Sequence, residues 1–265
     1  MRKLLAVFRI AWQYALTSRM RIVFWLGIDI LIPVVLSLLF KIIYPTPQST
    51  IAGLNYSQFI QYLLLATLIK VTLITYPSEE VSERIWRGTL SKNLLKPMSF
   101  PLYLITAGAG WRLFSVTLII PVFILISLAL NLKIIFISNL ISLVFILFSL
   151  IIGFIAFWIF DFTFGLTAFW LTDISGIQNL KGVMFMLLAG QFIPPQFLPL
   201  WLQKINQFLP FQYFLAFPVR LIQQTINNHE IIKSFAILFI YLIIFAFLAR
   251  RLWRQGLKQY SAVGI

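Results

Sequence analysis

Residues 134–170 read IIFISNLISLVFILFSLIIGFIAFWIFDFTFGLTAFW, and this stretch decides the fold class. It is mostly apolar from end to end, and Asp161 is its one charged residue. A helix rises about 1.5 Å per residue, so these residues form a helix longer than the roughly 30 Å hydrocarbon layer of a bilayer. The stretch therefore predicts one membrane crossing with overhang, or two crossings.

The composition of the whole chain is that of a membrane protein. Of its 265 residues, 61% are apolar and 11% are charged, whereas a soluble domain averages about 45–50% apolar residues. Such an excess does not fit inside one soluble core, because a core grows more slowly than the chain that forms it. No repeat or linker divides the sequence, so we expect one all-α, polytopic membrane domain over residues 1–265.

Further candidate spans lie on both sides of the opening stretch. Four of these candidates are long enough for a full crossing. The fifth candidate, Asn179–Ile193, is shorter than one crossing. If residues 134–170 cross twice, the chain has seven spans and its termini face opposite sides; if they cross once, it has six and the termini share a side. The full-length candidates each hold about 20 residues, enough to cross a bilayer as a helix, and are Ile22–Ile43, Tyr56–Tyr76, Leu102–Leu130 and Ile231–Leu252.

The charges favour six spans. Both ends of the chain are basic, and basic segments stay on the cytoplasmic side of a membrane. We therefore expect six transmembrane helices in a prokaryotic plasma membrane, with both termini cytoplasmic. The net charge of +14 then reflects cytoplasmic segments beside the lipid bilayer and does not indicate a nucleic-acid partner. The terminal basic residues are Arg2, Lys3, Arg9, Arg19, Arg21, Arg250, Arg251, Arg254 and Lys258, and Lys181 is counted on the same side.

Residues 1–21 predict an amphipathic helix that lies in the inner membrane interface. Arg2, Arg9, Gln13 and Thr17 form a polar stripe at near-helical spacing, and apolar residues such as Trp12 lie elsewhere on the helix, as in interfacial helices. The segment is either a simple anchor or a strut that links cytosolic parts to the spans. The sequence favours the anchor.

The segment 77–101 predicts a short cytosolic helix with a charged surface. Ser78 is the expected N-cap, with Glu79 and Glu80 in the first turn, where the helix dipole favours acids. Gly88 is the expected C-terminal stop. Three of the seven acids of the chain fall here, and acids do little to set topology, so we expect them to make a contact; the alternative is a solvated loop helix.

The same segment carries a family resemblance. Its pattern is Glu80…Ile85-x-x-Gly88-x-Leu90…Leu94-Leu95-x-Pro97. This pattern resembles the cytosolic coupling region of ABC-2 type permeases, the export-type membrane subunits of ATP-binding-cassette transporters. The resemblance implies that the loop seats in a socket on an ATPase subunit. The residues implied at that interface are Glu79, Glu80, Glu83, Arg84, Ile85, Arg87, Gly88 and Leu90.

A second match to that family lies downstream. Ala168-Phe169-Trp170 ends the fourth span, and Gly190-x-Phe192-Ile193-Pro194 ends the fifth. The resemblance implies that residues 194–228 form a re-entrant hairpin in the outer leaflet, whose prolines would break helices. Irregular backbone at that depth is tolerated only where protein or a wet cavity covers it. The implied motif residues are Gly190, Pro194, Pro195, Pro210 and Pro218.

The resemblance also implies how the chain is powered. The sequence has no G-x-x-x-x-G-K-[ST] phosphate-binding motif. ATP and Mg would therefore be bound by a separate ATPase subunit, and this chain would hold no cofactor and no catalytic residue. It would form half of a homo- or heterodimeric permease that exports a hydrophobic or amphipathic substrate.

Charged residues inside the spans are costly and usually paired. Asp29 and Lys70 have similar depths in antiparallel spans, so we expect them to pair. Arg112 and Asp161 are the second expected pair. We expect both pairs to fix helix packing and not to bind substrate.

Two other classes of function compete with the permease. Glu79-Glu80-x-x-x-Arg84 matches the E-E-x-x-x-R motif of intramembrane glutamate proteases, but His229 is the single histidine and is expected on the opposite side of the membrane. A secondary transporter usually shows internal repeats, and none is present. The chain has no cysteine, which excludes thiolate metal sites and, with one histidine, leaves no metal site to predict.

Overall fold

The computed structural model describes residues 2–44, 46, 49–130, 132 and 139–260, and most of these are helical. The first half contains α1 (Arg2–Thr17), α2 (Arg19–Ile43), β1 (Thr50–Ile51), β2 (Leu54–Asn55), α3 (Tyr56–Leu73), α4 (Pro77–Trp86), α5 (Leu90–Leu94) and α6 (Phe100–Ala129). The second half contains α7 (Leu140–Gly165), η1 (Leu166–Phe169), α8 (Ser175–Leu188), η2 (Pro195–Phe197), α9 (Leu200–Asn206), α10 (Phe211–Phe214), α11 (Ala216–Ile222) and α12 (Asn228–Gln259).

Within the described residues, 5 helical stretches are long and apolar enough to cross a membrane. The sixth expected span is α8, which starts at Ser175 and not at Asn179 and has 14 residues. At about 1.5 Å per residue it reaches about 21 Å, less than the hydrocarbon layer. The five long stretches are Arg19–Ile43, Tyr56–Trp86, Phe100–Ala129, Leu140–Phe169 and Asn228–Gln259.

Residues 140–169 form one long helical stretch. Helix α7 begins at Leu140, where the side chain of Asn139 accepts a hydrogen bond from the Ile141 amide at 2.9 Å. It continues through η1 to Phe169. Residues 134–138, the start of the expected span, lie outside the described residues.

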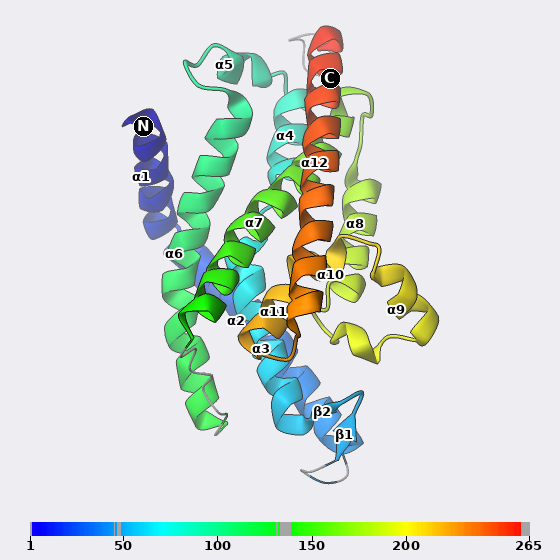
Figure 1. The fold of residues 1–265 in the computed structure, drawn as a ribbon. Coiled ribbons are helices and arrows are strands. Elements are labelled where there is room, and N and C mark those ends of the chain that lie inside the picture. Colours follow the sequence, from blue (N-terminus) through cyan, green and yellow to red (C-terminus); the bar gives the residue numbers. More distant parts are fainter. Residues whose placement is uncertain (1, 45, 47–48, 131, 133–138, 261–265) are drawn as a thin grey trace.

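Both chain ends lie at the same end of the bundle. Figure 1 shows the N- and C-termini at the end that carries α4 and α5, while the β-strands and the start of α12 lie at the opposite end. We call these the α4–α5 end and the hairpin end. This arrangement fits an even number of crossings, with α8 and the segment after it together carrying the chain from one end to the other.

Helix α3 is the centre of the bundle. In the stretch Tyr56–Trp86, which contains α3, 72% of the most apolar window is buried, against 28% or less in the other four long stretches. Helix α3 contacts α2, α6, α7 and α11, and Phe59, Tyr62 and Leu63 are almost completely buried. Helices α2, α6 and α7 therefore pack around α3, and the other four long stretches leave much of their apolar surface for lipid.

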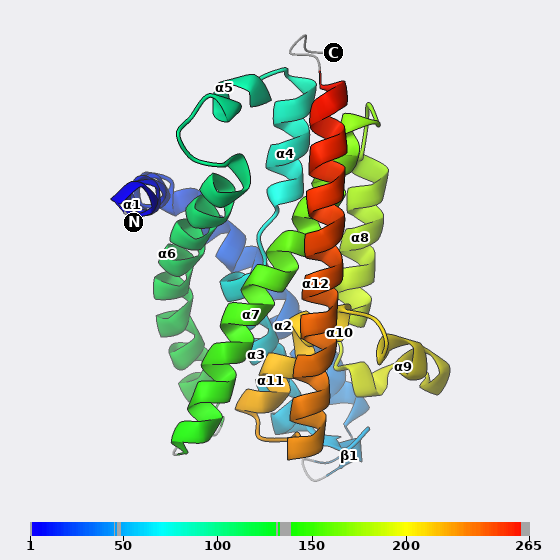
Figure 2. The same cartoon turned by 45° about the horizontal axis from the view of Figure 1, so that its top comes forward.

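Helix α1 is packed on α6 at a large inclination to α12. Figure 1 shows α1 along its length and Figure 2 shows it end-on, whereas α12 is seen along its length in both views. Gly110 of α6 permits the contact, since an added Cβ would lie 3.0 Å from both the Ala11 Cβ and the Phe8 carbonyl oxygen. The rings of Trp12 and Phe114 meet at 5.3 Å. Helix α1 is thus a tightly packed part of the fold.

The carbonyl groups at the C-terminal end of α8 are hydrogen-bonded to other parts of the protein. A helix leaves its last carbonyls without intrahelical partners, and inside a membrane these groups need protein partners. The Leu188 carbonyl accepts from the Asn206 side chain at 2.8 Å, and the Ala189 carbonyl accepts from the Ala216 amide at 3.1 Å. The Gly190 carbonyl accepts from the Tyr62 hydroxyl at 2.8 Å. The segment after α8 therefore completes this short helix.

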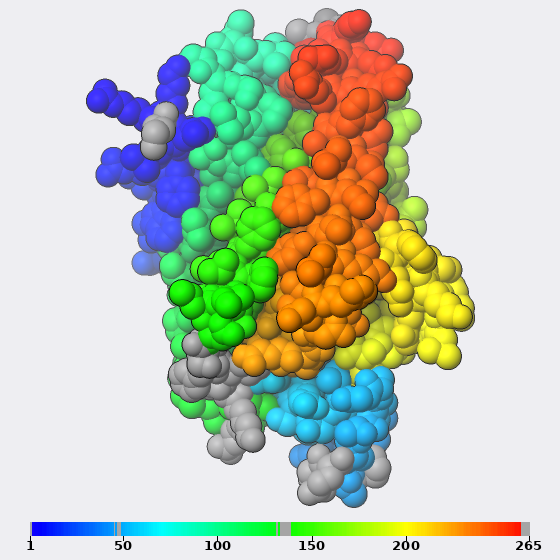
Figure 3. All heavy atoms as spheres, in the orientation of Figure 1, coloured from blue at the N-terminus to red at the C-terminus, as the bar shows by residue number. Residues whose placement is uncertain are grey.

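The segment 194–228 is folded and largely built into the bundle. Helices α10 and α11 contact α7, and Phe214, Leu215 and Val219 are completely buried. Helix α9 and the residues just after it are different, because Leu200 and Phe208 are each 76% exposed, and Figure 3 shows this part protruding from the bundle.

The prolines of this segment act differently from one another. Pro199 and Pro210 directly precede α9 and α10, and Pro195 begins η2. Pro218 lies in the first turn of α11, where its missing amide hydrogen breaks no intrahelical hydrogen bond. Helix α10 ends at Phe214, four residues before Pro218, and α11 begins at Ala216, which agrees with the expectation that Pro218 breaks a helix.

A β-hairpin interrupts the expected all-α architecture. Strands β1 and β2 pair antiparallel, with Thr50 opposite Asn55. The two residues between them, Ala52 and Gly53, have φ angles of 50° and 81°, as a tight two-residue hairpin turn requires. Asn55 then caps α3 through a reciprocal hydrogen bond with Gln58.

Candidate coupling surface and buried charges

Helix α4 begins two residues earlier than the sequence predicts. Pro77 occupies its first turn and Tyr76 precedes it, so Ser78 is not the N-cap. Pro is well suited to this position because its missing amide hydrogen is not needed there. Ser78 is instead completely buried, and its amide donates to the Asp161 Oδ2 of α7 at 2.8 Å. A carboxylate from another helix thus caps α4.

The partner of Asp161 is Lys181, and the expected Arg112–Asp161 pair is wrong. Lys181 of α8 forms an ion pair with Asp161, and its Nζ also donates to the Ser78 Oγ at 3.0 Å. The exposed fractions of the two charged side chains are 8% and 0%. Lys181 was not expected as the partner of Asp161, because its position in the sequence groups it with the basic residues of the cytoplasmic side. A lysine next to a short apolar span was the available signal.

Close backbone packing reinforces this network. Gly165 at the end of α7 faces α4, and an added Cβ would lie 2.6 Å from the Ser78 Cα. Val81 and Ile85 of α4 pack with Trp158 and Phe162 of α7 in one buried cluster. The N-terminal part of α4 is therefore held against α7 and α8 by an ion pair, a cap and a close backbone contact.

The opposite face of α4 is charged. Arg84 donates to Glu80 from its Nε at 2.8 Å, and Arg87 pairs with Glu83 at 2.9 Å. Both pairs have the i,i+4 spacing that supports a helix from its surface. Gly88 follows with a φ angle of 65°, the left-handed conformation that ends many helices.

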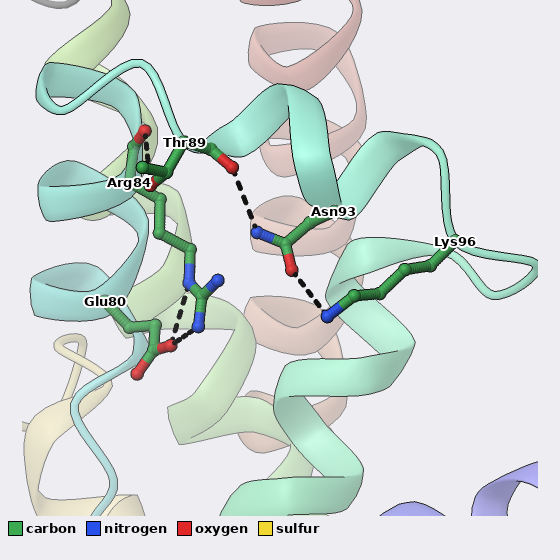
Figure 4. A network of polar contacts seen from close by, with 5 residues as sticks. All are labelled: Glu80, Arg84, Thr89, Asn93 and Lys96. Atoms are coloured by element: carbon green, nitrogen blue, oxygen red, sulfur yellow. Dashed lines mark hydrogen bonds and ion pairs between the residues drawn. The ribbon is translucent and has the colours of Figure 1, made fainter.

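Helix α5 follows that turn and exposes apolar residues. Figure 4 shows the polar contacts that hold it: the Asn93 side-chain Nδ2 donates to the Thr89 carbonyl at 3.3 Å, and the Lys96 Nζ donates to the Asn93 Oδ1 at 3.1 Å. Leu94 and Leu95 are 42% and 87% exposed. We call the exposed group at this end the coupling tip; it consists of Glu83, Arg87, Lys92, Leu94 and Leu95.

The residues implied for an ATPase interface divide into two groups. Glu79, Glu80, Glu83 and Arg87 are exposed. Ile85 and Leu90 are buried, with exposed fractions of 8% and 0%, and they pack α4 and α5 onto the bundle. The remaining two, Arg84 and Gly88, are partly buried. The surface available to a partner is thus smaller than the sequence motif.

Asp29 of α2 and Lys70 of α3 form the expected ion pair, with 2.6 Å between the Lys70 Nζ and the Asp29 Oδ1. Their side chains are 21% and 17% exposed. A cavity of about 610 Å³ borders this pair and also reaches Glu79 and Lys181. Lys181 and the Asp29–Lys70 pair therefore line the same cavity.

Arg112 has no such partner. Its Nε is buried without a hydrogen bond, and no carboxylate lies within ion-pair distance of it among the described residues. It lines the 610 Å³ cavity and also a second cavity of about 750 Å³ between α1, α4 and α6. Arg112 is therefore a cation that borders two cavities without an ion-pair partner among the described residues.

The geometry does not assemble the glutamate-protease site. Glu80 is engaged by Arg84 on the surface of α4. His229, the single histidine of the chain, is in the first turn of α12, which starts at the hairpin end (Figure 1). In the part of the chain that the structure describes, no three His, Cys, Asp or Glu residues are grouped so that they could hold a metal ion.

Long apolar helices around a buried central helix define a multi-pass membrane protein. A family model described as "ABC-2 family transporter protein" matches residues 30–264. The chain therefore belongs to the ABC-2 transporter family and is a membrane permease component of an ABC transporter. Members of this family are transport components without an ATPase site of their own. Comparison with curated proteins and with solved structures gave no match.

Proposed function

We propose that this permease exports a hydrophobic or amphipathic substrate with energy from ATP hydrolysed on a separate ATPase subunit. ATP and Mg are bound by that partner. The permease acts as one half of a dimer in a prokaryotic plasma membrane, and the α4–α5 end and both termini lie in the cytoplasm. The coupling tip is the surface that the ATPase contacts.

The observation that carries this proposal is the contrast between the two ends of α4. Its first turn is held to α7 and α8 through Ser78, Asp161 and Lys181. Its far end leads into α5, where Leu95 is 87% exposed. A push on the exposed tip is transmitted to two membrane helices, because the attachment is a buried ion pair with little room to yield.

The charge distribution supports the orientation. The α4–α5 end carries both basic chain ends and the basic residues of the 77–101 segment. Such an excess marks the cytoplasmic side. Leu94 and Leu95, the exposed leucines at the end of α5, lie at this same end. They suit a protein contact, because a partner that covers exposed apolar side chains removes them from water.

Single cysteines test both orientation and partner, because the natural chain has no cysteine. We predict that Leu95→Cys reacts with a membrane-impermeant maleimide only after cells are permeabilised, while the hairpin variant Thr50→Cys reacts in intact cells. With a co-expressed cassette ATPase carrying a cysteine in its docking groove, Leu95→Cys forms a cross-link and Thr50→Cys does not.

The two measurements fail independently. Labelling of Leu95→Cys in intact cells would show that the α4–α5 end lies outside the cell and would contradict the proposed topology. Correct labelling without any cross-link to the ATPase, while the two proteins still co-purify, would remove the coupling tip from the interface.

A further inference from the structure

The 750 Å³ cavity at the α4–α5 end is strongly basic. Its volume lies within the roughly 300–1,000 Å³ of typical small-molecule sites. Helices α1, α4 and α6 form its main walls. We call it the basic cavity. Its charged lining residues are Arg21, Arg84, Lys96, Arg112 and Glu80.

The cations of the basic cavity outnumber its available carboxylates. Glu80 is the one carboxylate in the lining, and it is already paired with Arg84. Arg21, Lys96 and Arg112 have no ion-pair partner among the described residues. Figure 4 shows Arg84 and Lys96 extending toward each other from α4 and from the loop after α5. An excess of cations around one cavity favours the binding of an anion.

Arg112 is the deepest of these cations. It lies about 18 Å along α6 from Phe100, and about 25 Å of helix remains beyond it, close to the hydrocarbon thickness. This places its guanidinium near the edge of the hydrocarbon layer. A desolvated cation without a partner is unfavourable, and the Nε of Arg112 has no hydrogen bond.

The walls of the cavity are aromatic and apolar. The Arg21 guanidinium carbon is 5.2 Å from the Trp111 ring centre, and the Lys96 Nζ is 5.0 Å from that of Tyr103. Val7 and Ile10 of α1 contribute apolar surface. Tryptophan and tyrosine are typical of the headgroup level of a membrane. The lining therefore matches a molecule that has an anionic head and an apolar body.

We propose that the basic cavity binds an anionic amphiphile whose head is a phosphate ester, with Arg112 and Arg21 contacting the phosphate. Arginine is the side chain that matches phosphate geometry, through two parallel hydrogen bonds. The apolar part of the ligand lies against α1 and the aromatic residues of α6. This site depends neither on the ATPase partner nor on the direction of transport.

Binding by the purified full-length chain in a neutral detergent tests the site. The probes are dioctanoyl phosphatidylglycerol, dioctanoyl phosphatidylcholine and inorganic phosphate, and the readouts are the Tm and native mass spectrometry. We expect the anionic lipid to bind and raise the Tm, and the other two probes to bind at least about 10-fold more weakly. Arg112→Met is expected to lower the affinity for the anionic lipid about 10- to 100-fold, the range for loss of a hydrogen bond to a charged group.

Matched variants make the result specific to the cavity. Arg254→Gln removes an exposed cation of the same end that does not line the cavity, and it should bind like the natural chain. Two further variants should also weaken binding: Arg21→Gln, which removes a second cation, and Ala107→Trp, which fills the cavity from α6. These two variants test the site if Arg112→Met does not fold. Unchanged binding in the folded cavity variants, or equal binding of phosphatidylcholine, overturns the proposal. If inorganic phosphate binds as tightly as the anionic lipid, the proposal of an amphiphilic ligand is overturned and the site is one for the free anion.

Discussion

Lys181 and Arg112 are two cations near the α4–α5 end of the bundle that both border the cavity of about 610 Å³, but their polar partners differ. Lys181 on α8 is closed in by Asp161 and by the Ser78 hydroxyl. Arg112 on α6 has no carboxylate partner among the described residues and lines two cavities. The comparison separates a charge that holds the fold together from a charge that remains available to a ligand.

The largest expected effect is the loss of the counter-charge of Lys181. Asp161→Asn keeps the shape of the side chain and leaves a buried lysine unpaired, which should lower the free energy of unfolding by about 3–5 kcal/mol. In the ligand-free protein, Arg112→Met should leave stability unchanged or raise it, because it removes an unpaired cation. Thermal unfolding of the purified variants in detergent measures both.

A double change checks that the effect belongs to the ion pair. Asp161→Asn combined with Lys181→Met removes both charges and should recover much of the lost stability. If the double variant is as unstable as Asp161→Asn, or if Arg112→Met is as damaging, the distinction between the two cations does not hold.

The next largest effect concerns the backbone contact beside Lys181. Gly165→Ala would place a Cβ 2.6 Å from the Ser78 Cα, so α4 must shift away from α7. Overpacking of this kind costs about 1–3 kcal/mol and should also disturb the cap on α4. Gly182→Ala on α8, which has nothing within 4 Å of the added Cβ, is the matched control. Similar Tm values for the two variants would contradict a tight contact.

The smallest expected effect is at the partly exposed pair. Asp29→Lys or Lys70→Asp alone places like charges together and should lower the free energy of unfolding by about 1–2 kcal/mol, less than at Lys181 because these side chains are 21% and 17% exposed. The exchanged double variant should recover most of this loss. A double variant no more stable than either single change would show that the pair does not contribute to packing.

The membrane class and the long helices could be read from the chain because they depend on local composition. Residues 56–76 and 102–130 predict α3 and α6 to within a few residues, since a run of apolar residues of bilayer length has no stable alternative to a helix in lipid. The left-handed turn at Gly88 could be predicted for a similar reason, because it follows from the properties of one residue.

The end of α8 and the partner of Asp161 could not be predicted in this way. The carbonyls that close α8 are satisfied by Asn206, Ala216 and Tyr62, which lie at scattered positions along the chain. Asp161 had two cations at plausible depth, and only the packing of α8 beside α4 and α7 selects Lys181 over Arg112.

The sequence by itself determined that this chain is a multi-pass membrane protein with a charged, glycine-ended helix between two spans. The tertiary structure alone decided that Ile85 and Leu90 face inward, that Lys181 closes on Asp161 and that Arg112 remains open to a basic cavity. The physical reason is that lipid and protein interior are equally apolar. Hydropathy therefore places a residue in the membrane but does not set the rotation of its helix, and rotation decides which charges meet.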